Sequence, residues 1–507
     1  MHKKPRKPPR VPHPHAPRPA VVSGGQAAGG SDSPEMLYML AKSQLRKRDV
    51  RGALPILERA VAAAPAVGKY HELLAQVHGA LGDKERAESE CRLALRFDAG
   101  RERAAILLGL ILLDRGEPGA ALEQFLAAVE ANPPCPEGLI NASVALNRLG
   151  EHERAAACSQ RVLAQDPHNP LAWTNLGMAH RAVGRREEAR QAFLQAGDFP
   201  LARFNLGYLF LQDNDLTRGL PLLEVRRKLL GIGRGMDGRP WTGGERPEKT
   251  LVIIQEQGMG DTILMSQFLR RVRPLFRKVF VQVQRPTLRL MAGAFPDFNV
   301  ISDLEGVNYD YWCPMMSLPF LLGVRDVSEL DREPWLRVPN SRALGRPTAA
   351  SGRLRVGLNW AGNPKFTYDA IRSTHLENLE LLLQVGDVDW VSLHKGHLEG
   401  EAERYDLPQP LRHAHDFYDT AMVLAGLDLV ISTETAVPNL SAALGVPTCV
   451  LSTADPDWRW GAWFPNVTVC RQQAPGNWFG ALAGVLEVIQ DLLRRGADGE
   501  EQTSSAA

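Results

Sequence analysis

The 507-residue sequence contains few cysteines, and they lie far apart along the chain. There are six, and no two of them form a Cys-x-x-Cys pair. This spacing disfavours both a disulfide framework and a zinc site, and it indicates buried, reduced thiols. We therefore expect no metal centre and a cytoplasmic location.

The sequence also lacks long apolar runs and an excess of charge of one sign. No run of about 18 or more uncharged apolar residues occurs, so we expect no transmembrane segment. The formal net charge of +1 gives no general attraction to nucleic acid, and we expect no nucleic-acid partner. Residues 1–33 are rich in Pro, Gly, Lys and Arg and lack the apolar centre of a secretory signal. They are predicted to form a disordered basic tail. Residues 496–507 are predicted to form a second disordered tail.

Small residues recur with a fixed period in the first half of the chain. Four glycines are each 34 residues apart: Gly82, Gly116, Gly150 and Gly184. Five alanines follow the same period: Ala53, Ala87, Ala121, Ala155 and Ala189. A 34-residue period predicts a tetratricopeptide-repeat (TPR) α-solenoid, with about six repeats over residues 34–230. The glycines would end helices in the left-handed conformation, and the alanines would let paired helices approach. Such arrays bind proteins, so we expect a protein partner.

The pattern changes after residue 230. A Gly-, Pro- and Arg-rich segment, residues 231–248, is interpreted as a linker or as a loop entering a new domain. Short apolar segments then alternate with helical ones. The apolar segments are TLVIIQ, VFVQV, LRVGLNWAG, DWVSLHKG, LDLVIST and PTCVLS. This alternation predicts a parallel α/β region.

Several segments in this half resemble a known family. In order, they are GMGDTILMSQFLRRV, VGLNWAGNPKFTYDAIRST, VSLHKG, DFYDTAMVLAGLDLVISTETAVPNLSAALGVPTCVL, and DPDWRW followed by WFPNVTVCRQ. They resemble bacterial glycosyltransferases that join TPR repeats to a heptosyltransferase-like domain, a family similar in plan to protein O-GlcNAc transferases. The resemblance implies a GT-B pair of Rossmann-like lobes, residues 249–350 and 351–495, with the donor bound mainly by the second. The first lobe is short, so the last repeats are expected to complete its surface.

The turn after TLVIIQ carries the predicted catalytic group. Gly258 and Gly260 lack side chains that would keep a substrate from the backbone amides of the following helix. Asp261 projects there, and the resemblance implies that it is the general base that accepts a proton from the acceptor hydroxyl. Helix capping is the alternative role for this aspartate. Thr262 belongs to the predicted donor-binding set.

The run NWAGNPKF follows a predicted strand at the carboxyl edge, where open α/β sheets bind ligands. Its candidate donor-binding residues are Asn359, Trp360, Gly362, Asn363 and Lys365. The lysine can hold a diphosphate as a point charge, and the resemblance implies the same contact. A solvated loop charge is the alternative.

Three more cationic or polar residues complete the basic side of the predicted site. Arg372 and Ser373 match an Arg-Ser pair of the family, in which the arginine would neutralise phosphate and the serine would cap a helix. Lys395, at another predicted strand end, would face the base or ribose. The neighbouring His394 is interpreted as a surface residue and not as a metal ligand.

The segment STETAVPNLSAALG follows a strand and opens a helix. Thr435, Ala436 and Val437 would offer a hydroxyl and free amides to the departing diphosphate, so no metal is needed. Many relatives read Asp-Thr-Ala-x-x-His here, whereas this chain has Glu434 and Asn439. Asn439 cannot transfer a proton, so either the sugar specificity has shifted or activity is reduced.

The run DPDWRW combines aromatic rings with an arginine. Trp458 and Trp460 beside Arg459 could stack on a base or a sugar ring. Packing of the tryptophans in the core is the alternative.

These features predict an enzyme, a metal-independent GT-B-type glycosyltransferase that moves a sugar from a nucleotide-sugar donor to a protein hydroxyl. No cofactor is expected beyond the donor substrate. The TPR array would select the acceptor, by analogy flagellin or another exported protein. Two alternatives remain: an inactive TPR scaffold with a vestigial nucleotide site, and a transferase that acts on an envelope glycolipid.

Overall fold

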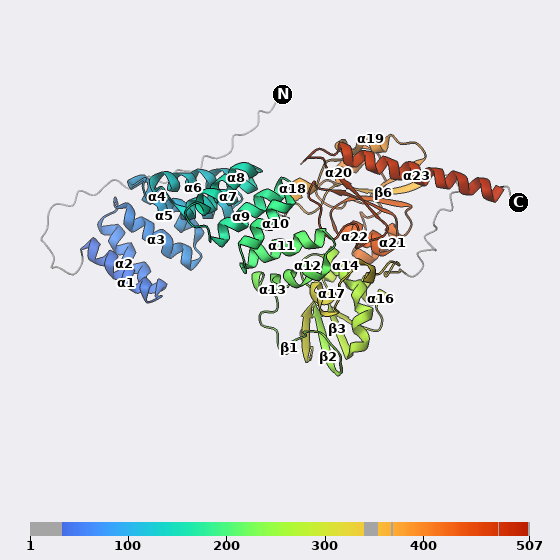
Figure 1. Ribbon diagram of the computed structural model, residues 1–507, viewed down its shortest axis with the longest axis horizontal. Coiled ribbons are helices and arrows are strands. Elements are labelled where there is room, and N and C mark those ends of the chain that lie inside the picture. Colours follow the sequence, from blue (N-terminus) through green and yellow to red (C-terminus); the bar gives the residue numbers. More distant parts are fainter. Residues whose placement is uncertain (1–32, 339–352, 367–368, 475, 505–507) are drawn as a thin grey trace, which may run out of the picture. The chain divides into compact units, whose positions relative to one another are not determined.

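The computed structural model describes residues 33–338, 353–366, 369–474 and 476–504 (Figure 1). It divides into two compact units, which meet in the sequence between Ala145 and Leu146. The division falls within the repeats, so the later repeats belong to the same unit as the sheets. The predicted N-terminal tail lies outside the described residues except for Ser33.

The helices from Pro34 onward form consecutive pairs, six in the described residues, followed by one short helix. The pairs are α1 (Pro34–Arg46) with α2 (Val50–Ala63), α3 (Gly68–Leu81) with α4 (Lys84–Phe97), α5 (Glu102–Asp114) with α6 (Pro118–Ala131), α7 (Pro136–Arg148) with α8 (His152–Leu163), α9 (Pro170–Ala182) with α10 (Arg186–Gln195), and α11 (Pro200–Gln212) with α12 (Leu216–Leu223); the short helix is α13 (Arg226–Leu229). The predicted TPR solenoid is confirmed.

The periodic residues have the predicted structural roles. The four glycines have φ of 84°, 85°, 78° and 78°, in the left-handed region that glycine adopts without strain. Arg48 and Asn214 take the equivalent place in the first and last repeats, with φ of 62° and 60°. All five alanines are fully buried. A larger side chain at those positions would push the paired helices apart.

The second half of the chain contains two five-stranded sheets, each with parallel neighbours. The first has the order β1 (Arg239–Pro240), β5 (Tyr311–Pro314), β2 (Arg246–Ile254), β3 (Phe276–Gln282), β4 (Asn299–Ile301). The second has the order β10 (Val467–Arg471), β9 (Thr448–Ser452), β8 (Leu429–Thr433), β6 (Leu354–Asn359), β7 (Val388–Ser392). The predicted parallel α/β region is confirmed. We call each sheet with its helices a lobe.

The helices of the lobes are mostly short. Those of the first lobe are α14 (Met259–Met265), α15 (Leu269–Val272), α16 (Leu288–Ala294) and α17 (Leu318–Leu321). Those of the second lobe are α18 (Asp369–Arg372), α19 (Glu380–Leu383), α20 (Glu399–Arg404), α21 (Phe417–Leu424), α22 (Ala436–Ala443) and α23 (Phe479–Ser504). Figure 1 shows α23 as the long terminal helix, which packs against β10 and β9.

Two predicted boundaries differ from the structure. Residues 231–248, interpreted as a linker or entering loop, contain β1 and the start of β2, and Trp241 within them is almost fully buried. Apolar burial and pairing with β5 thus make this segment part of the first sheet. At the other end, α23 continues through Ser504, into the segment predicted to be a disordered tail.

The last repeat packs against the first lobe. Leu216 and Leu220 of α12 share one hydrophobic core with Ile253 of β2 and Phe268 after α14. Burying a leucine side chain contributes about 1.5–3 kcal/mol. The solenoid therefore covers apolar surface that this short lobe does not cover by itself.

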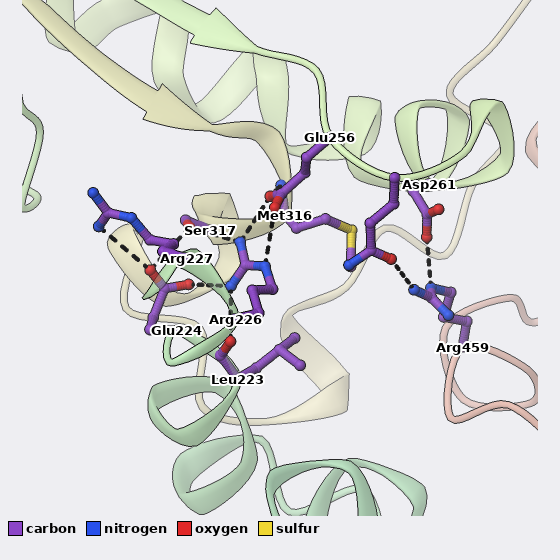
Figure 2. A network of polar contacts seen from close by, with 10 residues as sticks. Leu223, Glu224, Arg226, Arg227, Glu256, Asp261, Met316, Ser317 and Arg459 are labelled. Carbon is purple, nitrogen blue, oxygen red and sulfur yellow. Dashed lines mark hydrogen bonds and ion pairs between the residues drawn. The ribbon is translucent and has the colours of Figure 1, made fainter. Parts of the chain in front are cut away.

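A buried arginine also joins the solenoid to the first lobe (Figure 2). Arg226 of α13 is fully buried and donates two hydrogen bonds to Glu256, at 2.7 and 3.1 Å. It also donates to Glu224 at 2.7 Å and to the Ser317 hydroxyl at 2.8 Å. A buried charge is tolerated only with such partners. Because Glu256 directly precedes the turn that carries Asp261, this network fixes the start of that turn.

Among the residues that the structure describes, no helix has the length and apolar character needed to cross a membrane.

Candidate functional site

The second sheet gathers polar groups at the carboxyl ends of β6 and β8. Asn359, the last residue of β6, donates from Nδ2 to the Ser432 hydroxyl at 3.0 Å and to the Thr435 hydroxyl at 3.3 Å. The carboxyl edge of a parallel sheet is where α/β proteins bind ligands. The structure thus brings two predicted site residues, Asn359 and Thr435, into contact.

His394 and Trp360 lie behind this edge. Nδ1 of His394 is 3.3 Å from Oδ1 of Asn359, and the His394 ring is centred 4.9 Å from that of Trp360. The surface interpretation of His394 was wrong, because its side chain is buried. Burial also lowers the pKa of His394, which favours a neutral ring. Trp360, predicted to bind the donor, is fully buried in the core of the second lobe and packs there.

Hydrogen bonds join Gly362 to Ser373 and Arg372 to Glu434, which directly follows β8. The Gly362 N–H donates to the Ser373 hydroxyl at 2.9 Å. Arg372 donates to Asp369 at 3.0 Å and to the main-chain oxygen of Glu434 at 2.5 Å. A Cβ on Gly362 would lie 2.5 Å from Nη2 of Arg372, so the glycine makes room for that arginine. Ser373 therefore binds the main chain of Gly362, in place of the predicted helix cap.

The two predicted lysines lie outside this contact network. Lys365 is exposed, and its N–H donates to the side-chain oxygen of Asn363 at 3.0 Å, which forms a tight turn. Lys395 is also exposed and donates to the main-chain oxygen of Ala414. The contacts found among the described residues join neither ammonium group to the polar edge.

Helix α22 begins at the same edge. Thr435 is its N-cap, and its hydroxyl accepts the N–H of Val437 at 3.3 Å. Ala436 and Val437 form the first turn, where helix N–H groups and the helix dipole favour an anion. Asn439 donates to the Thr435 carbonyl at 2.9 Å, and its buried Oδ1 has no hydrogen-bond partner among the described residues.

The start of α22 touches the start of α14 from the first lobe. A Cβ on Gly260 would lie 2.8 Å from Nδ2 of Asn439 and 3.4 Å from the Cα of Ala436. Gly260 therefore permits close contact between two helix N-termini, whereas the sequence suggested room for a substrate. Gly258 is the N-cap of α14, with a φ of −94° that any residue can adopt.

Asp261 lies at this junction and faces Arg459 (Figure 2). Its Oδ2 accepts the N–H of the N-cap residue Gly258 at 2.8 Å, so the carboxylate caps the start of α14. Its Oδ1 lies 2.8 Å from Nε of Arg459, an ion pair that lacks hydrogen-bond geometry. Burial raises the pKa of Asp261 although Arg459 opposes the shift. A carboxylate with a raised pKa is a better proton acceptor, so a capping role and a base role are compatible.

Thr262 turns away from the junction between the lobes. It is buried, and its hydroxyl donates to the side-chain oxygen of Gln284 at 2.8 Å, just beyond β3. Its observed role is to hold the first lobe together.

Sequence reasoning missed the polar partners of Arg459. This arginine donates to Gln257 at 2.8 Å and to Asp457 at 2.5 Å. Gln257 has a φ of 59°, a strained value for a non-glycine residue that often marks functional sites. No local sequence pattern marks Gln257 as a site residue. Trp458 is buried in the core, so the packing alternative was correct for that ring.

Within the candidate site, Glu434 also has a raised pKa. Burial raises the pKa of Glu434 to about 7, and the charge of Asp457 adds to this shift. The Ser452 hydroxyl, at the end of β9, donates to Oε1 of Glu434 at 2.6 Å and opposes it. This carboxyl group therefore titrates near neutral pH inside the cluster.

A hollow beside β7 and the placement of possible metal-binding groups also bear on where the site lies. A shallow hollow of about 740 Å³ lies beside β7, lined by residues such as Arg355, Asp389 and Tyr405, and includes none of the predicted site residues. No group of three or more His, Cys, Asp or Glu side chains suited to a metal ion occurs in the described part of the chain. The polar cluster at the carboxyl edge is therefore the candidate site.

Comparison with known families defines the class of the helical half. The tetratricopeptide-repeat model matches residues 38–102, 106–170, 141–200 and 174–226. The chain thus contains tetratricopeptide repeats, and two parallel five-stranded sheets follow them in the described residues. Repeats of this kind are protein-interaction scaffolds.

Individual relatives extend the comparison beyond the repeats. The chain is 24% identical to Protein FlbA of Caulobacter vibrioides in an alignment of length 484, which covers 80% of this chain and 80% of that protein. It is 29% identical over 139 residues to human Protein O-mannosyl-transferase TMTC3, covering 26% of this chain but only 15% of that protein. Among solved structures, MamA has 19% identity, a TM-score of 0.31, and matches 33% of this chain and 91% of its own. YrrB, a TPR protein with an unusual peptide-binding site, has 21% identity and a TM-score of 0.31 over 34% of this chain and 91% of its own.

Proposed function

We propose that the protein is a metal-independent glycosyltransferase of the GT-B plan that moves a sugar from a nucleotide-diphosphate donor to a protein hydroxyl. The observation that carries this proposal is the junction of α14 and α22. There, the partly buried carboxyl group of Asp261, with a raised pKa, lies at one helix N-terminus, and a second helix N-terminus faces it from the other lobe.

The donor diphosphate is assigned to the carboxyl edge of the second sheet. The N–H groups of Ala436 and Val437 and the guanidinium of Arg372 offer positive charge there. As the bond from the sugar carbon to the diphosphate oxygen breaks, negative charge develops on the leaving group, and this positive charge stabilises it. Lys365, an exposed cation in the preceding loop, is assigned to the same diphosphate.

The acceptor hydroxyl is assigned to the side of Asp261. The hydroxyl oxygen attacks the sugar carbon and its proton passes to the Asp261 carboxylate. Asn439 takes no part in proton transfer, since an amide does not titrate in this range. Its role is to hold Thr435 at the start of α22.

The match to TMTC3 supports sugar transfer, and the tetratricopeptide repeats support a protein acceptor. The name of TMTC3 describes transfer of a mannosyl group to protein by that protein, and the present chain covers 15% of its length. The protein acceptor rests on the repeats, and flagellin or another exported protein stays a proposal. The cytoplasmic location is also part of the proposal and is supported by six free, buried cysteines.

An inactive scaffold is the second candidate function. It is favoured by the ion pair that occupies Asp261 and by the close contact of Gly260 with Asn439. In that case the repeats hold partners and no sugar is transferred.

Thermal unfolding with UDP-, GDP-, ADP- and CMP-linked sugars tests the donor site. Saturation at about 100 times Kd stabilises the native state by about 2.7 kcal/mol, so one nucleotide class should raise the midpoint clearly. Lys365→Ala should lose that shift while its unliganded midpoint is unchanged, because the side chain is exposed. The matched control is Arg353→Ala. Arg353 directly precedes β6 and pairs with Asp389 of β7, so this variant should still show the donor-induced rise in the midpoint. No shift with any donor would favour the scaffold.

A further inference from the structure

The loop after β9, residues 453–459, touches the last two repeats. Nε2 of Gln212, at the end of α11, donates to Oδ1 of Asp455 at 2.8 Å and to the Pro456 carbonyl at 2.7 Å. Nε of Arg181, on α9, lies 3.3 Å from Oδ2 of Asp455. The fifth and sixth repeats thus hold one end of this loop.

The other end of the loop holds Asp261. Arg459 has only 17% of its side chain exposed and contacts Asp261, Gln257 and Asp457. Two of these partners, Asp261 and Gln257, belong to the turn that begins α14 in the first lobe. The contact between the lobes therefore depends on where the loop places this guanidinium.

Bonds within the loop hold each of its two halves, and Glu434 accepts bonds from Ser452 before the loop and from Asp457 inside it. The Thr453 hydroxyl donates to the Asp455 carbonyl at 2.9 Å, and the Arg459 N–H donates to Asp457 at 3.0 Å. The Asp457 N–H also donates to Glu434 at 3.4 Å, which ties the loop to the end of β8. Because only Pro456 separates Asp455 from Asp457, and Asp457 binds Arg459, we expect a displacement of Asp455 to move Arg459 as well.

We propose that Arg459 is a positioning residue for Asp261, and that Gln212 and Arg181 set its position through the 453–459 loop. The last two repeats are then part of the candidate site and not only a docking arm for the acceptor. The structural half of this inference stands on the contacts alone. Its consequence for catalysis rests on the proposed glycosyl transfer.

Hydrogen exchange of the full-length protein tests the structural half without any donor. Replacing both Arg181 and Gln212 by alanine should speed amide exchange in peptides that cover residues 453–460 and 257–262. We expect an increase of roughly tenfold in both, since local opening becomes easier where the holding contacts are lost. The matched control is Arg185→Ala, which removes an ion pair with Glu153 in the same part of the solenoid. Unchanged exchange in residues 257–262, or an equal increase in the control, would overturn the inference.

Donor hydrolysis, with water as the acceptor, tests the consequence for catalysis. A docking arm has no role in this reaction, so loss of docking alone leaves it unchanged. We expect the double variant to lower kcat by roughly tenfold or more with KM for the nucleotide sugar nearly unchanged. An unchanged kcat would overturn the catalytic role of the repeats. If the wild-type protein turns over no donor, the proposed transferase function fails instead, and the exchange result still decides the structural half.

Discussion

Ion pairs differ between the repeats of the first unit and the short helix α13 of the second unit. In the first unit, Lys84 pairs with Asp114 of the next repeat, and both side chains are 61% exposed. In the second unit, Arg226 pairs with Glu256 of the first lobe, and the exposed fractions are 0% and 3%. Exposed pairs contribute little to stability, whereas cutting a buried pair leaves a charge without compensation. Changes to exposed charges in the first unit should therefore have little effect on stability, whereas loss of the buried Arg226 pair should destabilise the contact with the first lobe.

The largest expected effect comes from breaking the buried pair. Arg226→Ala should destabilise the second unit by about 3–5 kcal/mol, because Glu256 and Glu224 lose their shared buried counter-ion. Urea unfolding followed by tryptophan fluorescence measures this. The neighbouring Arg227→Ala is the control, since Arg227 is 29% exposed and lies 3.7 Å from Glu224. Equal unfolding midpoints for the two variants would show that the buried Arg226 pair contributes no more to stability than the more exposed Arg227 pair.

A second buried group should make the stability of the same unit depend on pH. Burial raises the pKa of Glu434 from 4.5 to about 7, so the native state keeps a proton that the unfolded state loses at lower pH. Its contribution is full below pH 4.5 and is lost as the pH rises through 7. The loss amounts to about 3 kcal/mol at most. Glu434→Gln should remove this slope in unfolding measured from pH 5 to 8; parallel curves for the two proteins would contradict the assignment.

The contact between the two helix N-termini should show a smaller effect. Gly260→Ala places a methyl group against the Asn439 amide and should cost about 1–3 kcal/mol. Asn439→Ala removes the obstacle, so the double variant should be more stable than the sum of the single effects by about 0.5–3 kcal/mol. Chemical unfolding of the four proteins closes the cycle. Simple additivity would mean that the two residues do not meet.

The smallest effect is expected in the outer repeats. Lys84→Ala and Asp114→Ala should leave the unfolding midpoint of the first unit unchanged within error, because water solvates either charge once its partner is gone. The same urea series measures both variants. A clear loss of stability in either variant would contradict the claim that the exposed pair contributes much less than the buried Arg226 pair.

The sequence predicted the solenoid well because its structure is local. In four repeats, one glycine and one alanine determine a turn and a close helix contact within a single period. The alternation of strands and helices likewise predicted the parallel sheets. The missed strands carry weaker signals: β4 has three residues, and β5 (YWCP) ends in proline. β10 (VTVCR) does alternate, and this signal was available in the sequence.

The site was only partly predictable, for a physical reason. Asn359, Thr435 and Arg372 follow predicted strands, so their meeting at one edge follows from sheet topology. The pair of Asp261 with Arg459 joins residues almost 200 positions apart, and no local pattern encodes it. Trp360 shows the converse error, because a ring beside a predicted site was in fact needed for the core.

The most direct test of the proposed function is sugar transfer by the full-length protein and by Asp261→Asn. With the donor that stabilises the protein and a candidate acceptor protein, we measure label moved to the acceptor per unit time. The account predicts that Asp261→Asn lowers turnover by roughly 10²- to 10⁴-fold while the donor still raises the unfolding midpoint. Equal turnover by the two proteins would show that Asp261 is not the base, and no transfer by the wild-type protein would contradict the transferase itself.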